Sequence, residues 1–251
     1  MGKIIAVVNQ KGGVGKTTST VNIAAQIAAS GKSVLIVDLD PQGNASSGLG
    51  IDKSQLHFTT YDLLCQGTQL NEVIQETTNK NLYIVPTDAN LAGAEVSLVN
   101  EIAREFKLRD SLKLSSHDYV FIDCPPSLGL LTINALAAAD AVLIPVQAEY
   151  YALEGLSQLL ATVQRVREGL NSELSIFGVV VTMFDKRTSL SEQVLGELTN
   201  YFGDKMFATV VPRNIRLAEA PSYGKTIFEH DKWSKGARAY KQLAKEVMSR
   251  G

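Results

Sequence analysis

The sequence predicts a single α/β domain: a P-loop NTPase built on a mainly parallel, twisted β-sheet with helices on both faces. Apolar runs at residues 3–8, 34–38, 82–86, 119–123, 141–145 and 177–182 are continuous, which is typical of strands buried on both faces. Helix-like spacing occurs between and after them, near residues 18–29, 90–103, 129–138, 151–168, 190–202 and 234–249. Because strands and helices alternate, we expect the strands to run parallel.

The composition agrees with one domain over residues 1–251. The chain is 45% hydrophobic and 20% charged, which allows a substantial buried core. We expect no added N-terminal helix-turn-helix domain and no signal peptide, because a strand is predicted at the start of the chain. No apolar run approaches the roughly 18 residues that span a bilayer, so we expect a cytoplasmic protein. Residues 43–60, rich in Gly, Ser and Asn, predict an irregular, mobile loop.

The first predicted strand leads into a variant of the phosphate-binding loop, Asn9-Gln10-Lys11-Gly12-Gly13-Val14-Gly15-Lys16-Thr17-Thr18. The ordinary pattern is G-x-x-x-x-G-K-[ST], whereas Gln10 replaces the first glycine here and Lys11 is an additional lysine. The glycines let backbone N–H groups approach phosphates, Lys16 neutralises phosphate charge, and the Thr17 hydroxyl suits Mg²⁺. The predicted nucleotide-binding residues of the loop are Lys11, Gly12, Gly13, Val14, Gly15, Lys16, Thr17 and Thr18.

Aspartates follow two of the predicted strands. Asp38 and Asp123 each end an apolar run, and Asp40 lies two residues beyond Asp38. Ligands of parallel sheets bind at the carboxyl ends of the strands, and an aspartate there that faces a P-loop usually holds Mg²⁺, directly or through water. Each aspartate alone is equally compatible with a helix cap or a turn. Their combination with the P-loop favours a magnesium-dependent site.

Positive charge is concentrated near the end of the chain. The formal net charge is −2, yet residues 186–251 hold twelve basic and seven acidic residues, a local net charge of +5. Such a cluster is ordinarily a solvated helical face. The alternative is contact with nucleic-acid phosphates, and we expect phosphate contacts rather than base stacking.

Four segments together resemble the ParA/Soj chromosome- and plasmid-partitioning ATPases, over essentially the whole chain. They are residues 11–18, Asp38-Leu39-Asp40-Pro41-Gln42-Gly43-Asn44, Asp123-Cys124-Pro125-Pro126, and Gln147-Ala148-Glu149-Tyr150-Tyr151-Ala152-Leu153-Glu154-Gly155-Leu156. The two-lysine loop, a deviant Walker A motif, is shared with a wider superfamily that includes the cell-division regulator MinD and the nitrogenase iron protein. The second and fourth segments resemble the partitioning branch.

The resemblance implies an ATPase that acts as an ATP-sandwich homodimer. In this family the additional lysine, here Lys11, reaches the phosphates of the partner subunit. It adds positive charge where negative charge develops in the transition state. The implied catalytic residues are Lys11, Lys16 and Asp40, with Asp40 orienting the attacking water. ATP would then act as a dimerisation switch, sensed by loops 40–50 and 123–132.

The resemblance also implies ligand contacts. Thr17 would bind Mg²⁺, and Asp123 and Asp38 would act on the metal through water. Pro212 and Asn214 match the position where family members hold adenine, although a strand end followed by a turn would look similar.

The resemblance further implies a biological cycle. The dimer would bind double-stranded DNA without sequence preference, placing the cytoplasmic protein on the nucleoid, and a ParB/Spo0J-type partner would stimulate otherwise slow hydrolysis. Two copies of a weak basic patch would form one stronger site. The candidate DNA-binding residues are Lys186, Arg187, Arg216, Lys225, Lys232 and Lys235.

Three alternatives remain at this stage. A MinD-like ATPase would anchor its C-terminal amphipathic helix, residues 234–249, in a membrane, although we expect this helix to dock on the core and no stable membrane association. A reductase resembling the nitrogenase iron protein would need two cluster cysteines, and Cys124 lies near a suitable place while Cys65 does not. A related ATPase would position another cargo, such as a chemoreceptor cluster.

Overall fold

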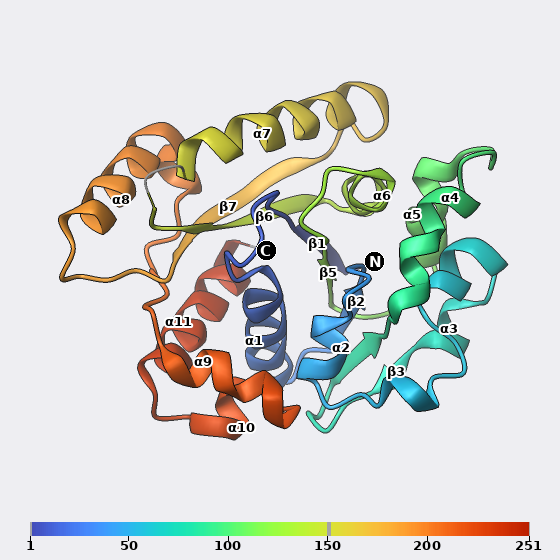
Figure 1. Cartoon of the computed structure of the whole chain (residues 1–251), viewed down its shortest axis with the longest axis horizontal. Helices are drawn as coiled ribbons and strands as arrows, with labels where there is room; N and C mark the ends of the chain where they lie inside the picture. Colours follow the sequence, from blue (N-terminus) through green and yellow to red (C-terminus); the bar gives the residue numbers. More distant parts are fainter. Residues whose placement is uncertain (1, 150–151, 251) are drawn as a thin grey trace.

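The computed structural model describes residues 2–149 and 152–250, and within them the strands form one seven-stranded sheet. The spatial order is β3-β4-β2-β5-β1-β6-β7, and all pairs are parallel except β3 with β4. The predicted parallel α/β fold is therefore confirmed (Figure 1). The strands are β1 (Lys3–Val7), β2 (Val34–Asp38), β3 (Gln75–Glu76), β4 (Leu82–Val85), β5 (Tyr119–Asp123), β6 (Ala141–Gln147) and β7 (Ser175–Thr182).

Helices cover both faces of the sheet (Figure 1). Alternate side chains of each strand enter different layers: Ile4 and Ala6 join a core with α5 to α8, whereas Ile5 and Val7 join a core with α1 and α11. The helices are α1 (Lys16–Ala29), α2 (Asn44–Gly48), α3 (Leu70–Val73), α4 (Ala94–Ser97), α5 (Lys107–Leu112), α6 (Leu130–Ala138), α7 (Ala152–Gly169), α8 (Ser189–Phe202), α9 (Ile215–Glu219), α10 (Ile227–Asp231) and α11 (Lys235–Arg250).

The C-terminal helix α11 packs along α1. The side that the sequence presents as a possible membrane anchor is buried in this contact, with Tyr240 and Leu243 at most 1% exposed. The Tyr240 hydroxyl also hydrogen-bonds the Ser19 hydroxyl of α1 at 3.0 Å. The expectation that this helix docks on the core is thus confirmed. None of the helices in the described part of the chain is long and apolar enough to cross a membrane.

Two expectations about local structure are wrong. The predicted helix over residues 90–103 is a 3₁₀ turn (Ala89–Gly93) followed by the short α4; the helical spacing of buried Leu91, Ala94 and Leu98 suggested a longer element. Ala103, with a φ of 55°, has a left-handed backbone that cannot continue an α-helix. Residues 44–48, expected to be part of an irregular loop, form the largely buried α2.

The strand order places the predicted site residues together. Strand β5 lies between β1 and β2, and Asp123 is in register with both Val7 and Asp38. The P-loop that follows β1 and the aspartates that end β2 and β5 therefore share one edge of the sheet. This is the edge where parallel sheets bind ligands.

Candidate functional site

Side chains from distant parts of the chain hold the P-loop in place. The Asn9 amide donates to the Pro145 carbonyl oxygen of β6 at 2.7 Å, and its oxygen accepts from the Lys11 backbone N–H at 2.9 Å. The Thr182 hydroxyl of β7 donates to the Val14 carbonyl oxygen at 2.8 Å. These contacts tie the loop to β6 and β7.

Glycines give this loop its shape. Gly13 and Gly15 have φ values of 75° and 88°, in the left-handed region that favours glycine. Helix α1 begins immediately afterwards at Lys16, so unpaired N–H groups and the positive end of the helix dipole face the loop. The predicted phosphate-binding residues 11–18 therefore lie at a helix N-terminus, a geometry that suits an anion.

Lys16 lies inside this site, with 6% of its surface exposed. Its ammonium group donates to the Lys11 carbonyl oxygen at 3.2 Å. Burial lowers the pKa of Lys16, whereas the carboxylates of Asp123 and Asp40 raise it. A phosphate group would add the negative charge that favours the ammonium form.

Asp123 connects β5 to the first turns of α1. It accepts hydrogen bonds from the Thr17 hydroxyl at 2.7 Å and the Thr20 hydroxyl at 3.2 Å. Burial, together with the nearby charge of Asp38, raises the pKa of Asp123 to about 8. Thr20 was not predicted, although its position three residues after Thr17 places both hydroxyls on one helix face.

Asp38 organises the loop that carries Asp40. The fully buried Asp38 carboxylate accepts from the Ser46 N–H at 2.8 Å and the Ser46 hydroxyl at 2.7 Å. Burial raises the pKa of Asp38 to about 6 despite these bonds. Asp40, which is 7% exposed, accepts from the Gln42 N–H at 3.0 Å. The Asp38–Ser46 contact explains why α2 is packed down rather than loose.

These side chains fit a magnesium ion. Asp38, Asp40 and Asp123 bring carboxylates to one edge of the sheet, the Thr17 hydroxyl contacts Asp123, and the charges of Asp123 and Asp40 act on the buried Lys16 ammonium. Hard oxygen donors of this kind are the ligands that Mg²⁺ prefers. A divalent cation here would also offset the burial that disfavours the ionised carboxylates.

The additional lysine does not point at the phosphate site of its own chain. The Lys11 ammonium group pairs with the carboxylate of Glu149, just beyond β6, and both side chains are 43% exposed. Glu149 belongs to the fourth segment of the family resemblance, but the sequence alone gave it no partner. Residues 150 and 151 of that segment lie outside the described residues.

A cavity of about 280 Å³ lies beside Gly15, on the side of the loop away from the aspartates' strands. The predicted adenine residues Pro212 and Asn214 both line it, together with Met183 and Tyr240. The side-chain oxygen of Asn214 is buried and has no hydrogen-bond partner within the described residues. A buried unpaired acceptor is costly, which suits a ligand that brings a donor.

A second, basic cleft of about 680 Å³ shares Pro212 and Arg213 with this cavity. It brings together three predicted DNA-binding residues, Lys186, Arg187 and Lys235, and adds Arg213 and Arg238, which were not among the candidates. All five lie in the basic last third of the chain, and this concentration of charge is the sequence feature that could have identified Arg213 and Arg238. The cleft has the charge expected of a phosphate-binding surface.

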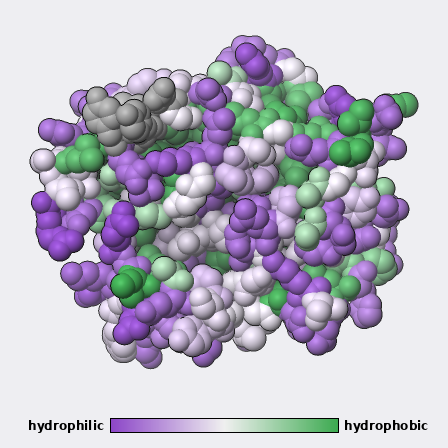
Figure 2. Space-filling model, viewed as in Figure 1, coloured by the Kyte–Doolittle hydropathy of each residue, from purple (hydrophilic) through white to green (hydrophobic). Residues whose placement is uncertain are grey.

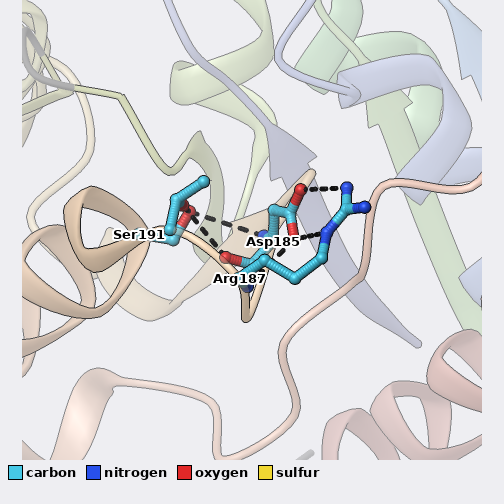
Figure 3. A network of polar contacts seen from close by, with 4 residues as sticks. Asp185, Arg187 and Ser191 are labelled. Carbon is cyan, nitrogen blue, oxygen red and sulfur yellow. Dashed lines mark hydrogen bonds and ion pairs between the residues drawn. The ribbon is translucent and has the colours of Figure 1, made fainter.

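Arg187 is held by an acidic neighbour in this cleft. Figure 3 shows its guanidinium group paired with both oxygens of Asp185, at 2.9 and 2.7 Å, and Ser191 beside them. This bidentate pairing places the pKa of Asp185 well below its usual range. A DNA phosphate would therefore compete with Asp185 for Arg187.

The other predicted DNA-binding residues lie outside the lining of this cleft. Lys225 lines a different cleft, with Thr17 and Thr18. Arg216 pairs with Glu219 at 2.8 Å, and the Lys232 ammonium lies 5.3 Å from the Trp233 ring centroid. Only three of the six candidate DNA-binding residues therefore line the basic cleft.

The cysteines do not fit the reductase alternative. Cys124 is completely buried in the core, so its thiol cannot share a cluster with a second subunit. Cys65 is half-buried, next to Leu64 in a different region. Within the described residues, no group of three or more His, Cys, Asp or Glu side chains is arranged to hold a metal ion by itself, so Mg²⁺ at the sheet edge would also need the Thr17 hydroxyl, phosphate oxygens and water as ligands.

Comparisons with known proteins agree with the site. A family model described as an AAA domain matches residues 2–176. The chain is 56% identical to the sporulation initiation inhibitor protein Soj of Bacillus subtilis, over 100% of both chains. It is 51% identical to the chromosome partitioning protein ParA of Myxococcus xanthus, covering 100% of this chain and 89% of that protein.

A solved structure adds ligands to the comparison. It is a cobyrinic acid a,c-diamide synthase from Mycobacterium smegmatis with bound ADP and magnesium, 36% identical, with a TM-score of 0.87 over 99% of this chain and 94% of that one. Its ligands agree with ATP and Mg²⁺ as the expected cofactors. The P-loop, the clustered aspartates and the full-length identity to Soj and ParA lead to one conclusion: this chain belongs to the ParA/Soj family of chromosome-partitioning ATPases.

Proposed function

We propose that this chain is an ATP-driven DNA-partitioning switch. With ATP and Mg²⁺ it forms a sandwich homodimer that binds double-stranded DNA without sequence preference, and slow hydrolysis, stimulated by a ParB/Spo0J-type partner, returns it to the free state. The observation that carries the proposal is the position of Lys11. It lies at the rim of a complete P-loop, 43% exposed, where a partner subunit's nucleotide can meet it.

The nucleotide contacts follow from the two sides of Gly15. Phosphates bind the N–H groups of residues 11–18 and the Lys16 ammonium, and adenine occupies the cavity lined by Pro212 and Asn214. The unpaired Asn214 oxygen would accept a hydrogen bond from the adenine amino group. This would satisfy a buried acceptor and select an adenine nucleotide.

The carboxylates would have two different roles in ATP hydrolysis, metal binding and positioning of the attacking water. Thr17, with Asp123 and Asp38 acting through water, would hold Mg²⁺, which neutralises charge on the phosphates when bound. Asp40 orients the attacking water, because its side chain is at the same edge of the sheet but remains slightly exposed. Lys16 and the partner's Lys11 stabilise the negative charge that develops on the γ-phosphate.

Dimerisation would couple this site to DNA. One copy of the basic cleft formed by Lys186, Arg187 and Lys235 offers few phosphate contacts, so a monomer would bind weakly. Two linked copies act at high effective concentration, and the dimer binds far more strongly. Slow ATP hydrolysis would keep the ATP-bound dimer long-lived enough to bind the nucleoid of a cytoplasmic cell compartment.

Other functions are less well supported. The name cobyrinic acid a,c-diamide synthase belongs to a protein that is 36% identical, against 56% for Soj. A membrane-anchored ATPase would need an exposed apolar helix face, whereas that side of α11 is buried. Positioning of another cargo would use the same switch and differs only in what the dimer binds.

The decisive experiment measures binding of a fluorescent random-sequence duplex by anisotropy with ATP, ADP or no nucleotide, over a series of salt concentrations. Asp40→Ala protein serves as the long-lived ATP form. We expect binding only with ATP, weakening steeply as salt rises. Binding without nucleotide, or no binding at all, would contradict the proposal and favour another cargo.

A further inference from the structure

Two large aromatic side chains are exposed among the cations near the end of the chain. Trp233, the single tryptophan of the protein, is 79% exposed and precedes α11, while Tyr223 is 67% exposed and precedes α10. Trp and Tyr are much more often largely buried, and where exposed they are enriched at binding surfaces. Neither residue belongs to the phosphate-binding loop or to the cluster of catalytic carboxylates described above.

Hydrogen bonds and ion pairs tie this aromatic surface to Arg216. The Trp233 backbone N–H donates to one oxygen of Asp231 at 3.1 Å, and the other oxygen lies 3.7 Å from the Arg216 guanidinium. Arg216 also pairs with Glu219 at 2.8 Å. The Trp233 backbone and the Arg216 guanidinium therefore share one carboxylate, that of Asp231.

The remaining neighbours extend the same network. The Tyr223 ring stacks on His230, with centroids 5.1 Å apart and planes at 26°, and His230 lies 3.4 Å from the Glu219 carboxylate. Lys232 places its ammonium 5.3 Å from the indole centroid. The aromatic surface, defined as Tyr223 and Trp233, thus has the Lys232 ammonium beside its indole and is connected to Arg216 through Glu219 and Asp231.

We propose that Trp233 contacts double-stranded DNA directly, with its indole against the sugars and base edges while Arg216 and Lys232 bind phosphates beside it. Tyr223 supports the same contact from the α10 side. This inference rests on the proposed function and adds a non-ionic contact to it. A planar side chain packed mainly on sugars suits binding without sequence preference, because sugar contacts occur at every nucleotide and carry no sequence information directly.

The surroundings favour DNA over a membrane as the occupant. Lys232 and Lys235 flank Trp233 in sequence, and an anionic duplex complements them. Insertion into a bilayer requires a broad apolar helix face, but the apolar side of α11 is buried against α1. Figure 2 agrees, since the surface over α9 to α11 is mostly hydrophilic with only a small apolar patch.

The single tryptophan makes the contact directly measurable. Emission excited near 295 nm comes from Trp233 alone, so we expect addition of a duplex to ATP-bound Asp40→Ala protein to quench and shift it. Acrylamide should then quench the indole less than it does in the free protein. Free N-acetyltryptophanamide with the same duplex corrects for light absorbed by DNA.

Substitutions separate the aromatic contact from charge. Trp233→Ala should weaken duplex binding several-fold at every salt concentration, because the apolar contact of the indole with the duplex is lost. The slope of log affinity against log salt should stay unchanged, since no phosphate contact is lost. Trp233→Phe should restore most of the affinity, whereas Lys232→Ala should lower the slope by about one for each phosphate contact removed.

Matched controls make the failures distinguishable. Tyr201→Ala removes an aromatic side chain that is 67% exposed on α8, outside this network, and should leave binding unchanged. If wild-type protein binds duplex with ATP but Trp233→Ala binds equally well and the indole emission does not change, this inference is wrong and the proposed function stands. If no form binds duplex, the proposed function fails. An emission shift with phosphatidylglycerol vesicles but not with duplex would assign Trp233 to a membrane and overturn the inference.

Discussion

The Lys11 ammonium group of the P-loop is paired with the Glu149 carboxylate of the same chain, although the two residues are 138 positions apart. The additional lysine is therefore already occupied at the end of β6. If Lys11 is to reach the phosphates of a partner subunit, this ion pair must open. The pair opposes dimerisation by a small amount, since exposed ion pairs contribute about 0–1 kcal/mol.

Removing the charge of Glu149 should favour the dimer. We expect Glu149→Gln to strengthen ATP-dependent dimerisation by up to about five-fold, because Lys11 no longer has to leave a carboxylate. Sedimentation with a non-hydrolysable ATP analogue measures this, and Glu168→Gln, an exposed change on α7, is the control. Weaker dimerisation would mean that Glu149 assists the interface. Lys11→Ala should bind nucleotide but not dimerise.

Asp40 should separate binding from hydrolysis. Asp40→Ala removes the carboxylate that orients water but leaves the loop residues 11–18 intact, so nucleotide and DNA binding should persist. Phosphate release should fall at least about 100-fold, as is typical when a positioned general base is lost. Asp52→Ala is the control, because it removes an exposed aspartate that caps the turn at residues 53–55, and this variant should retain ATP hydrolysis. Undiminished hydrolysis by the Asp40 variant would end the role assigned to it.

The Asp185–Arg187 pair should limit DNA binding. Asp185→Asn frees the Arg187 guanidinium and removes a negative charge from the basic cleft, so we expect tighter duplex binding with a steeper salt dependence. Arg187→Ala should weaken binding several-fold and flatten that dependence. Asp110→Asn breaks an exposed ion pair between Asp110 of α5 and Lys113, which follows this helix, and should have no effect. Equal affinity of all variants would exclude Arg187 from the interface.

His117 should make stability depend on pH. Its ring is half-buried, edge-on to Tyr83 at 5.1 Å, and burial lowers its pKa below 6.5. Because the folded state binds a proton at His117 less readily than the unfolded state, protonation favours unfolding. The free energy of unfolding should therefore fall as the pH drops below the ordinary histidine pKa of 6.5. Urea unfolding should therefore show wild type losing more stability than His117→Gln between about pH 7.5 and about pH 5.5. Parallel losses would refute this.

Local patterns were sufficient for the long elements and the P-loop. Continuous apolar runs identified the six parallel strands because each is buried on both faces, and the loop's glycines, lysines and threonines act through chemistry that neighbouring residues supply. Short pieces were missed. α2, α9 and α10 have five residues each, too few for a helical period to stand out, and packing on other segments stabilises them.

The glycine-rich loop, the strand-ending aspartates and the family resemblance could all be inferred from local sequence. The partners of these residues could not, and they emerge only in the folded chain: Thr17 with Asp123, Lys11 with Glu149, and Asp38 with Ser46. The first two pairs are separated by more than 100 residues, and the register of neighbouring strands brings them together. Such contacts arise from the packing of whole elements, which leaves no periodic signal in the local sequence.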